Sequence, residues 1–148
     1  VMTGLLGGIA SAMILASRAV PDLETPLKAM ADGYHAADGL ASELYAAQTI
    51  TARSAASITF TVADRNADSN PETIQYSWSG VAGQPLNRQY NGGTAGVVLD
   101  NVYQFDLRYD TQNSGGPNKV TVVHITIRAG ADATSRVDTS VQLLNQPS

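Results

Sequence analysis

Hydrophobic and polar positions change their periodicity twice along this chain. Residues 1–17 are apolar or small without any charge, and Arg18 is the first charged residue. From Pro26 to about Ser54, apolar residues recur every three or four positions, a spacing that predicts an amphipathic helix. Beyond Ser54 the apolar period falls to two. The single apolar face expected on the helix consists of Leu23, Leu27, Met30, Tyr34, Ala37, Ala41 and Leu44.

Five segments in the second half of the chain alternate apolar and polar residues, which predicts half-buried strands. Glycine, asparagine and proline residues separate them, as expected of turns. One polar face per strand predicts an antiparallel sheet that is covered on one side. The order of the elements predicts an α+β fold, in which a long N-terminal hydrophobic and amphipathic helix packs on an antiparallel β-sheet. The predicted strands centre on residues 58–62, 74–78, 103–109, 123–127 and 137–143.

The composition of the chain excludes several classes of function and of metal site. A length of 148 residues with 43% hydrophobic residues is sufficient for one domain with a core. A net charge of −4 with only nine Lys and Arg residues argues against nucleic acid as a partner. The absence of cysteine and the presence of two histidines exclude a disulfide framework, a thiolate metal site and a three-histidine zinc site. The sequence contains no nucleophile or phosphate-loop signature. We therefore expect no catalytic residues, no enzyme activity and no small-molecule substrate.

The charge-free N-terminal run is almost long enough to cross a bilayer, and no basic residue precedes it as in a signal peptide. We expect residues 1–20 to form a hydrophobic transmembrane or filament-core helix, and residues 21–148 to form a periplasmic α+β domain. Small residues at every fourth position would lie along one face of this helix and permit close packing against a second helix. These helix-packing residues are Gly4, Gly8, Ala12 and Ala16.

One segment carries oxygen donors at every second position. Calcium takes about six to eight oxygen ligands, and the segment begins like the calcium-loop pattern D-x-[DN]-x-[DN]. Ser69 and Gln75 stand where the EF-hand pattern has its glycine and its bidentate glutamate. Because Asp and Asn also suit turns, the segment is interpreted either as a calcium site or as a polar turn. We expect no other cofactor. The candidate ligands are Asp64, Asn66, Asp68, Asn70 and Glu72.

The order of elements and several local strings resemble the type IV pilin-like family, in particular the minor pseudopilins of bacterial type II secretion and related minor pilins. The family's glycine cleavage site, the N-methylated aromatic residue that follows it and the glutamate at the fifth mature position are absent from this sequence. The matching segments are the apolar run 1–17, the helix through Leu44, the strand pair 58–62 and 74–78, the strand 102–109 and the closing strand 141–145.

The resemblance implies a structural subunit of a type II secretion pseudopilus or of a type IV pilus-like filament. Such a subunit is inserted in the bacterial inner membrane as a single-pass protein with a periplasmic globular domain, and it then packs its N-terminal helix in the filament core. The implied partners are other pilin-like subunits and the inner membrane. An alternative is a membrane-anchored periplasmic ligand-binding module. The direct run from the apolar segment into the amphipathic helix favours the filament subunit.

Overall fold

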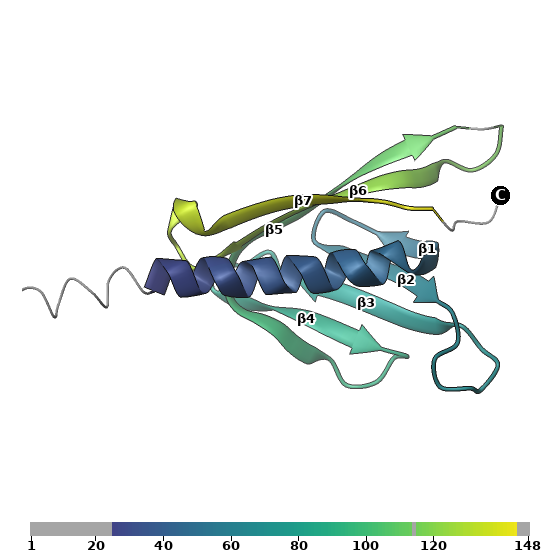
Figure 1. Ribbon diagram of the computed structural model, residues 1–148, viewed down its shortest axis with the longest axis horizontal. Helices are drawn as coiled ribbons and strands as arrows, with labels where there is room; N and C mark the ends of the chain where they lie inside the picture. Colours follow the sequence, from purple (N-terminus) through teal and green to yellow (C-terminus); the bar gives the residue numbers. More distant parts are fainter. Residues whose placement is uncertain (1–24, 114, 145–148) are drawn as a thin grey trace, which may run out of the picture.

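A computed structural model of the chain describes residues 25–113 and 115–144. Residues 25–45 form a helix, and seven strands follow in one antiparallel sheet whose spatial order is the order of the chain. The helix crosses one face of the sheet, with β5–β7 on one side of it and β2–β4 on the other (Figure 1). The elements after the helix are β1 (Ala47–Arg53), β2 (Ser57–Val62), β3 (Glu72–Trp78), β4 (Gln84–Tyr90), β5 (Gly96–Gln112), β6 (Lys119–Ala129), the 3-10 helix η1 (Ala133–Ser135) and β7 (Arg136–Gln142).

The predicted pilin-like α+β fold is wrong, because the described residues form a mostly-β fold with one helix and a seven-stranded sheet. The helix ends at residue 45 instead of continuing to about Ser54. The cause is the run Thr49-Ile50-Thr51, whose β-branched side chains favour a strand and lie in β1. The segment 1–20, predicted to begin a long hydrophobic helix, lies outside the described residues. The predicted helix-packing residues Gly4, Gly8, Ala12 and Ala16 lie outside them as well.

The predicted cellular location also needs correction. Across residues 25–113 and 115–144, no helix combines the length and the apolar character that crossing a bilayer requires. The structure therefore does not support a single-pass inner-membrane protein with a periplasmic globular domain.

All five predicted strands are confirmed: four lie within β2, β3, β5 and β6, and the fifth, 137–143, coincides with β7 apart from Leu143, which follows the end of the strand. The patterning does not predict β4, because its sequence QPLNRQY lacks apolar alternation and has a single fully buried side chain, Leu86. This strand forms because β3 and β5 pair with it on both edges. Tertiary pairing, and not local propensity, therefore determines its conformation.

The core lies between the helix and the inner face of the sheet, as predicted for a sheet covered on one side. Alternate residues of the strands point toward the helix, and the intervening polar residues form the opposite face. The largest fully buried apolar side chains are Phe60, Leu40, Leu44, Ile58, Ile74, Leu86, Ile125 and Ile127.

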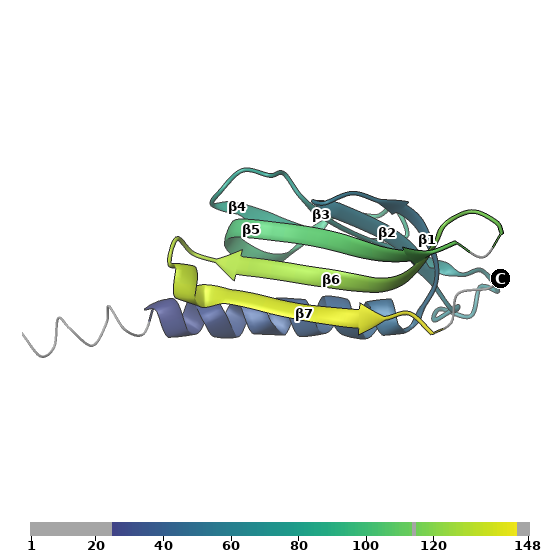
Figure 2. The same cartoon turned by 90° about the horizontal axis from the view of Figure 1, so that it is seen from above.

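The helix approaches the sheet through a glycine. A Cβ atom placed on Gly33 would lie 3.7 Å from Val137 Cγ2, 3.9 Å from Ala129 Cβ and 3.9 Å from Ile127 Cγ2. The helix backbone is therefore almost in van der Waals contact with β6 and β7, and Figure 2 shows the helix running alongside β7. Toward the C-terminal end of the helix, Leu40 and Leu44 belong to the core and have no exposed surface.

The observed buried face of the helix is rotated from the predicted one. Leu27 is 64% exposed, Met30 43% and Tyr34 64%, although the apolar spacing placed them toward the core. Ala37 and Leu44 are buried as predicted, together with Ala36 and Leu40, which lie outside the predicted face. The close approach at Gly33 explains the small buried side chains next to it, because only small side chains allow two backbones to come so near.

The strand β5 connects two halves of the sheet. Its residues 96–102 pair with β4, and residues 102–112 pair with β6. A register shift lies between Val102 and Gln104, and Asn101 has a φ of 54°, which is the signature of a bulge that bends a strand. Along the second half of β5, the turn after β1 supplies hydrogen bonds, and Leu107 N donates to Ala55 O at 2.8 Å.

Two helix glycines differ in what surrounds them, and this difference tests the close contact. A Cβ atom on Gly39 meets nothing within 4 Å, and one on Gly33 meets ordinary van der Waals contacts. We expect Gly39→Ala and Gly33→Ala each to raise the free energy of unfolding by about 0.5–1 kcal/mol, because alanine favours the helix. We expect Gly33→Leu to lower it by about 1–3 kcal/mol through overpacking. Urea unfolding followed by circular dichroism measures these changes. A Gly33→Leu protein as stable as the wild type would contradict the close helix–sheet contact.

Candidate functional site

A largely buried ion-pair cluster joins the C-terminal half of the helix to the sheet. Arg88 Nη2 donates to Glu43 Oε1 at 2.6 Å, and Arg88 Nε donates to Glu43 Oε2 at 3.0 Å. Tyr76 Oη donates to the same Oε2 at 2.7 Å. The Glu43 side chain is 18% exposed. Two parallel charge-assisted hydrogen bonds fix both direction and distance, so this cluster determines where the helix lies along β3 and β4.

The charges around Glu43 keep its carboxylate ionised. Burial raises its pKa, but hydrogen bonds from Arg88 and Tyr76, together with the positive charges of Arg88 and Arg65, outweigh burial and hold the pKa below its ordinary value of 4.5. Burial, and then the Glu43 carboxylate, raise the pKa of Tyr76 far above its ordinary range, so the tyrosine hydroxyl stays a donor.

The loop of residues 63–71, between β2 and β3, brings three carboxylates together. Asp64, Asp68 and Glu72 each offer one oxygen atom, and these atoms lie within 4.8 Å of one another. Asp64 and Asp68 are exposed, whereas Glu72 at the start of β3 is 1% exposed. Converging carboxylate oxygens are the ligands preferred by a hard cation such as calcium.

The same side chains also support the turn interpretation. Asp64 Oδ1 accepts the N–H of Asn66 at 3.0 Å, and Asp64 Oδ2 accepts the N–H of Ser69 at 2.7 Å. Asn66 Oδ1 accepts the N–H of Asp68 at 2.9 Å, and Asp68 Oδ1 accepts that of Asn70 at 2.8 Å. At every second position, a side-chain oxygen therefore accepts the N–H of the residue two positions later and stabilises the turn. Asp64 Oδ1 also accepts the N–H of Ala67 at 2.8 Å, whereas Asp64 Oδ2 accepts one hydrogen bond and keeps a further lone pair, so the geometry is compatible with both interpretations.

Of the five predicted ligands, the structure thus brings together the three carboxylates. The amides of Asn66 and Asn70 serve the loop backbone instead, and Asn70 Nδ2 donates to Asp68 O at 3.1 Å. The sequence reasoning missed Asn91, whose Nδ2 donates to Glu72 Oε2 and whose Oδ1 accepts the N–H of Thr73 at 2.7 Å. The signal for Asn91 was its position before two glycines, which is typical of a turn residue with positive φ.

Arg65 connects this loop to the Glu43 cluster. Its Nη1 lies 3.7 Å from Glu43 Oε1, and its backbone N–H donates to Glu72 Oε1 at 3.4 Å. One residue therefore contacts both the helix and the carboxylate group of the loop, so the loop conformation and the position of the helix are linked.

The exposed side of the helix carries an apolar stripe, which consists of Leu27, Met30 and Tyr34. Residues three and four positions apart lie on one face of a helix, and all three side chains are more than 40% exposed. Next to the stripe, Tyr34, Ala41 and Val137 contribute to a small cleft of about 80 Å³ between the helix and β7. Adjoining exposed apolar side chains are typical of an interaction surface.

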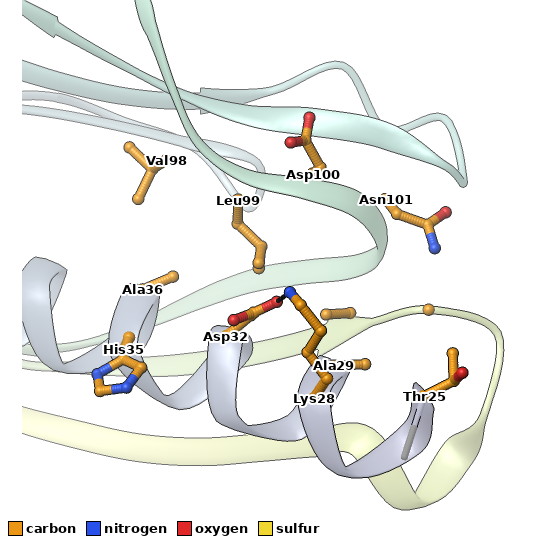
Figure 3. A pocket seen from close by; sticks show the side chains of 12 residues that line it. Thr25, Lys28, Ala29, Asp32, His35, Ala36, Val98, Leu99, Asp100 and Asn101 are labelled. Atoms are coloured by element: carbon orange, nitrogen blue, oxygen red, sulfur yellow. Dashed lines mark hydrogen bonds and ion pairs between the residues drawn. The ribbon is translucent and has the colours of Figure 1, made fainter. Parts of the chain in front are cut away.

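A larger cleft of about 490 Å³ lies between the N-terminal part of the helix and β5. Figure 3 shows the ion pair between Lys28 and Asp32 next to Leu99, whereas Asp100 points away from the helix. The charged groups of this cleft therefore do not converge on a common point. In a site that orients a small ligand, the polar groups do converge.

The strand register also brings together a histidine, an aspartate and a serine on the outer face of the sheet. His124 Nε2 lies 2.9 Å from Asp110 Oδ2, and His124 pairs with Ser140 across β6 and β7. Although all three residues belong to the described part of the chain, no hydrogen bond joins Ser140 to His124. Without that bond the serine is not activated as a nucleophile.

We expect Glu43→Gln to lower the free energy of unfolding by about 2 kcal/mol near neutral pH, because Arg88 and Tyr76 lose a charged acceptor. The folded-state pKa of Glu43 is lowered, so the contribution is present above pH 4.5 and disappears as the pH falls through the folded-state pKa. Urea unfolding at about pH 7 and about pH 3 should therefore show a larger difference from wild type at the higher pH. As a control, Asp32→Asn breaks the exposed pair with Lys28 and should cost at most about 0.5 kcal/mol. Equal costs for the two variants would contradict the role of the cluster.

The two interpretations of the 63–71 loop differ in their response to calcium. Under the calcium interpretation, millimolar Ca²⁺ stabilises the folded protein by about 1–3 kcal/mol and raises Tm. Asp68→Asn removes this rise while keeping the oxygen that accepts the Asn70 N–H. The control Asp100→Asn removes an exposed charge elsewhere and leaves the rise unchanged. Under the turn interpretation, each of the three proteins has the same Tm in Ca²⁺ as in EDTA.

Comparison with known proteins adds no relative: no family model, no curated protein and no solved structure matches this chain. The resemblance to type IV pilin-like proteins therefore depends on the sequence segments alone and stays a prediction. The function has to be argued from the surfaces and side-chain groups described above.

Proposed function

We propose that this chain is a structural, non-enzymatic subunit of a filament related to the type II secretion pseudopilus or the type IV pilus, and that it assembles with other subunits through its helix. The observation that carries this proposal is the apolar stripe Leu27, Met30 and Tyr34, which is exposed on a helix that is otherwise firmly docked. Burying such side chains against a neighbour contributes about 1.5–3 kcal/mol each when burial is complete.

Rigid presentation of the stripe supports the same function. The contact at Gly33 holds the helix near its middle, and the hydrogen bonds between Glu43 and Arg88 hold it near its C-terminal end. A rigid surface loses little conformational entropy when it binds a partner. The helix is therefore suited to repeated contacts of one fixed geometry, which a filament requires.

The alternative function, a ligand-binding module, has less support at the large cleft. A small-molecule site usually has a few polar groups aimed at one point, and in this cleft Lys28 is already paired with Asp32. The apolar stripe, in contrast, is left exposed by residues 25–113 and 115–144.

Negative charges introduced on the stripe test assembly directly. We expect Leu27→Glu combined with Tyr34→Glu in the full chain to abolish self-association or co-assembly with partner subunits, because two carboxylates cannot be buried in an apolar contact. Sedimentation velocity and cross-linking measure assembly, and thermal unfolding should change little because both side chains are exposed. The matched control is Ser42→Glu, an exposed helix position outside the stripe. Assembly of the double variant at wild-type levels would contradict the proposal.

A further inference from the structure

The strand β7 forms an open edge of the sheet. Within residues 25–113 and 115–144 it pairs with β6 alone, and it is the last strand in the spatial order (Figure 2). Leu143 continues this register, and its N–H donates to Thr121 O at 2.9 Å. The odd-numbered residues of β7 therefore exchange hydrogen bonds with β6, and the even-numbered residues direct their N–H and C=O groups away from it. These even-numbered residues are Arg136, Asp138, Ser140 and Gln142.

The backbone groups along this edge have no hydrogen-bond partner in the described part of the chain. Unpaired N–H and C=O groups at every second residue are the template to which a further β-strand binds. β7 pairs with β6 without a register shift, and it contains no proline or lysine, which commonly protect a sheet edge. The edge at β1 differs, because register shifts between Ala47 and Thr49 and between Ile50 and Ala52 interrupt its spacing. The regular edge of this sheet is therefore β7.

Exposed apolar side chains gather beside this edge. Tyr34 lines the small cleft between the helix and β7. Leu27 and Tyr45 lie on the same side of the helix as Tyr34, because about two and about three helical turns separate them from it. A strand added to β7 would therefore bury apolar surface as well as pair backbone groups. Of the seven large apolar side chains that the described residues expose, five lie along this edge: Leu27, Met30, Tyr34, Tyr45 and Leu144.

The sequence of β7 is complementary to itself. Two antiparallel β7 strands related by a two-fold axis through Thr139 overlap over all seven residues. In this register Asp138 faces Ser140 of the second strand, and Arg136 faces Gln142, so no like charges are opposed. A shift of the axis by one residue to Asp138 would place two aspartates opposite each other, which is destabilising.

We propose that the β7 edge binds β7 of a second copy of this chain and forms a two-fold dimer with one continuous sheet. The four pairs of even-numbered residues then exchange about eight backbone hydrogen bonds. On the inner face, Val137 faces Val141 of the second copy, a pair of β-branched side chains that suits adjacent strands. The axis places both helices, with their exposed apolar side chains, on the same face of the joined sheet. This dimer goes beyond the filament contact proposed above, because it requires only two identical copies.

A cysteine at the two-fold axis tests this register, since the chain has no cysteine of its own. The two Thr139 residues would form a non-hydrogen-bonded pair with Cα atoms about 4.5 Å apart, a distance that a disulfide bridges. The two Ser140 Cα atoms would lie about 9 Å apart, although Ser140 is more exposed than Thr139. Under mild oxidation, we expect Thr139→Cys to form about tenfold more disulfide-linked dimer than the matched control Ser140→Cys on a non-reducing gel.

A proline tests the backbone pairing itself. Ser140→Pro removes an N–H from the free edge and leaves the hydrogen bonds to β6 in place. Ser140→Ala keeps this N–H and is the matched control. We expect sedimentation velocity at about 50 µM to show a dimer for the wild-type full chain and for Ser140→Ala, and a monomer for Ser140→Pro. Circular dichroism checks the fold of each variant, and the cysteine pair still decides if Ser140→Pro does not fold.

Three outcomes overturn the proposal: a monomeric wild-type protein, equal cross-linking by Thr139→Cys and Ser140→Cys, or a dimer that a folded Ser140→Pro protein retains. Failure of the filament proposal is distinguishable from failure of this one. A Thr139→Cys dimer that does not assemble with other subunits contradicts the filament proposal alone. Filament assembly without the Thr139→Cys cross-link contradicts the β7 dimer alone.

Discussion

The close approach of the helix to β6 and β7 at Gly33 is the constraint on which the other features depend. A Cβ atom there would already touch Val137, so the helix face around Gly33 must consist of small residues. That requirement fixes the rotation of the helix about its own axis. With the rotation fixed, Leu27, Met30 and Tyr34 necessarily remain outside, and Glu43 faces the sheet. The exposed stripe is therefore a consequence of tight packing.

The Glu43 cluster adds a second constraint of a different kind. Apolar contacts between a helix and a sheet are non-directional, and they tolerate small displacements along the helix axis. A carboxylate that accepts two hydrogen bonds from Arg88 and one from Tyr76 tolerates none without losing an interaction. Desolvation offsets much of the stability of such an ion pair, so its main effect here is to define one position of the helix.

The strands and the turns could be predicted from the sequence to different degrees. Alternation located β2, β3, β5, β6 and β7, because each has one buried face. Alternation did not locate β4, which is held by its neighbours. The helical spacing, in turn, placed the end of the helix beyond Thr49, which lies in β1. At the candidate site, spacing identified Asp64, Asp68 and Glu72. It did not identify Arg65 or Asn91, since contacts between residues far apart in sequence leave no periodic signal.

The division of the sheet at β5 has a consequence for how this molecule can vary. One half of the sheet is joined to β5 through residues 96–102 and the other through residues 102–112, with a bulge between them. On the outer surface, the side chains of β2–β4 are uncharged, those of β5–β7 include charges of both signs, and the two halves meet along this same strand. Substitutions on one half can therefore accumulate without disturbing the pairing of the other. The two halves of the sheet share β5, and each half can acquire its own surface side chains during evolution.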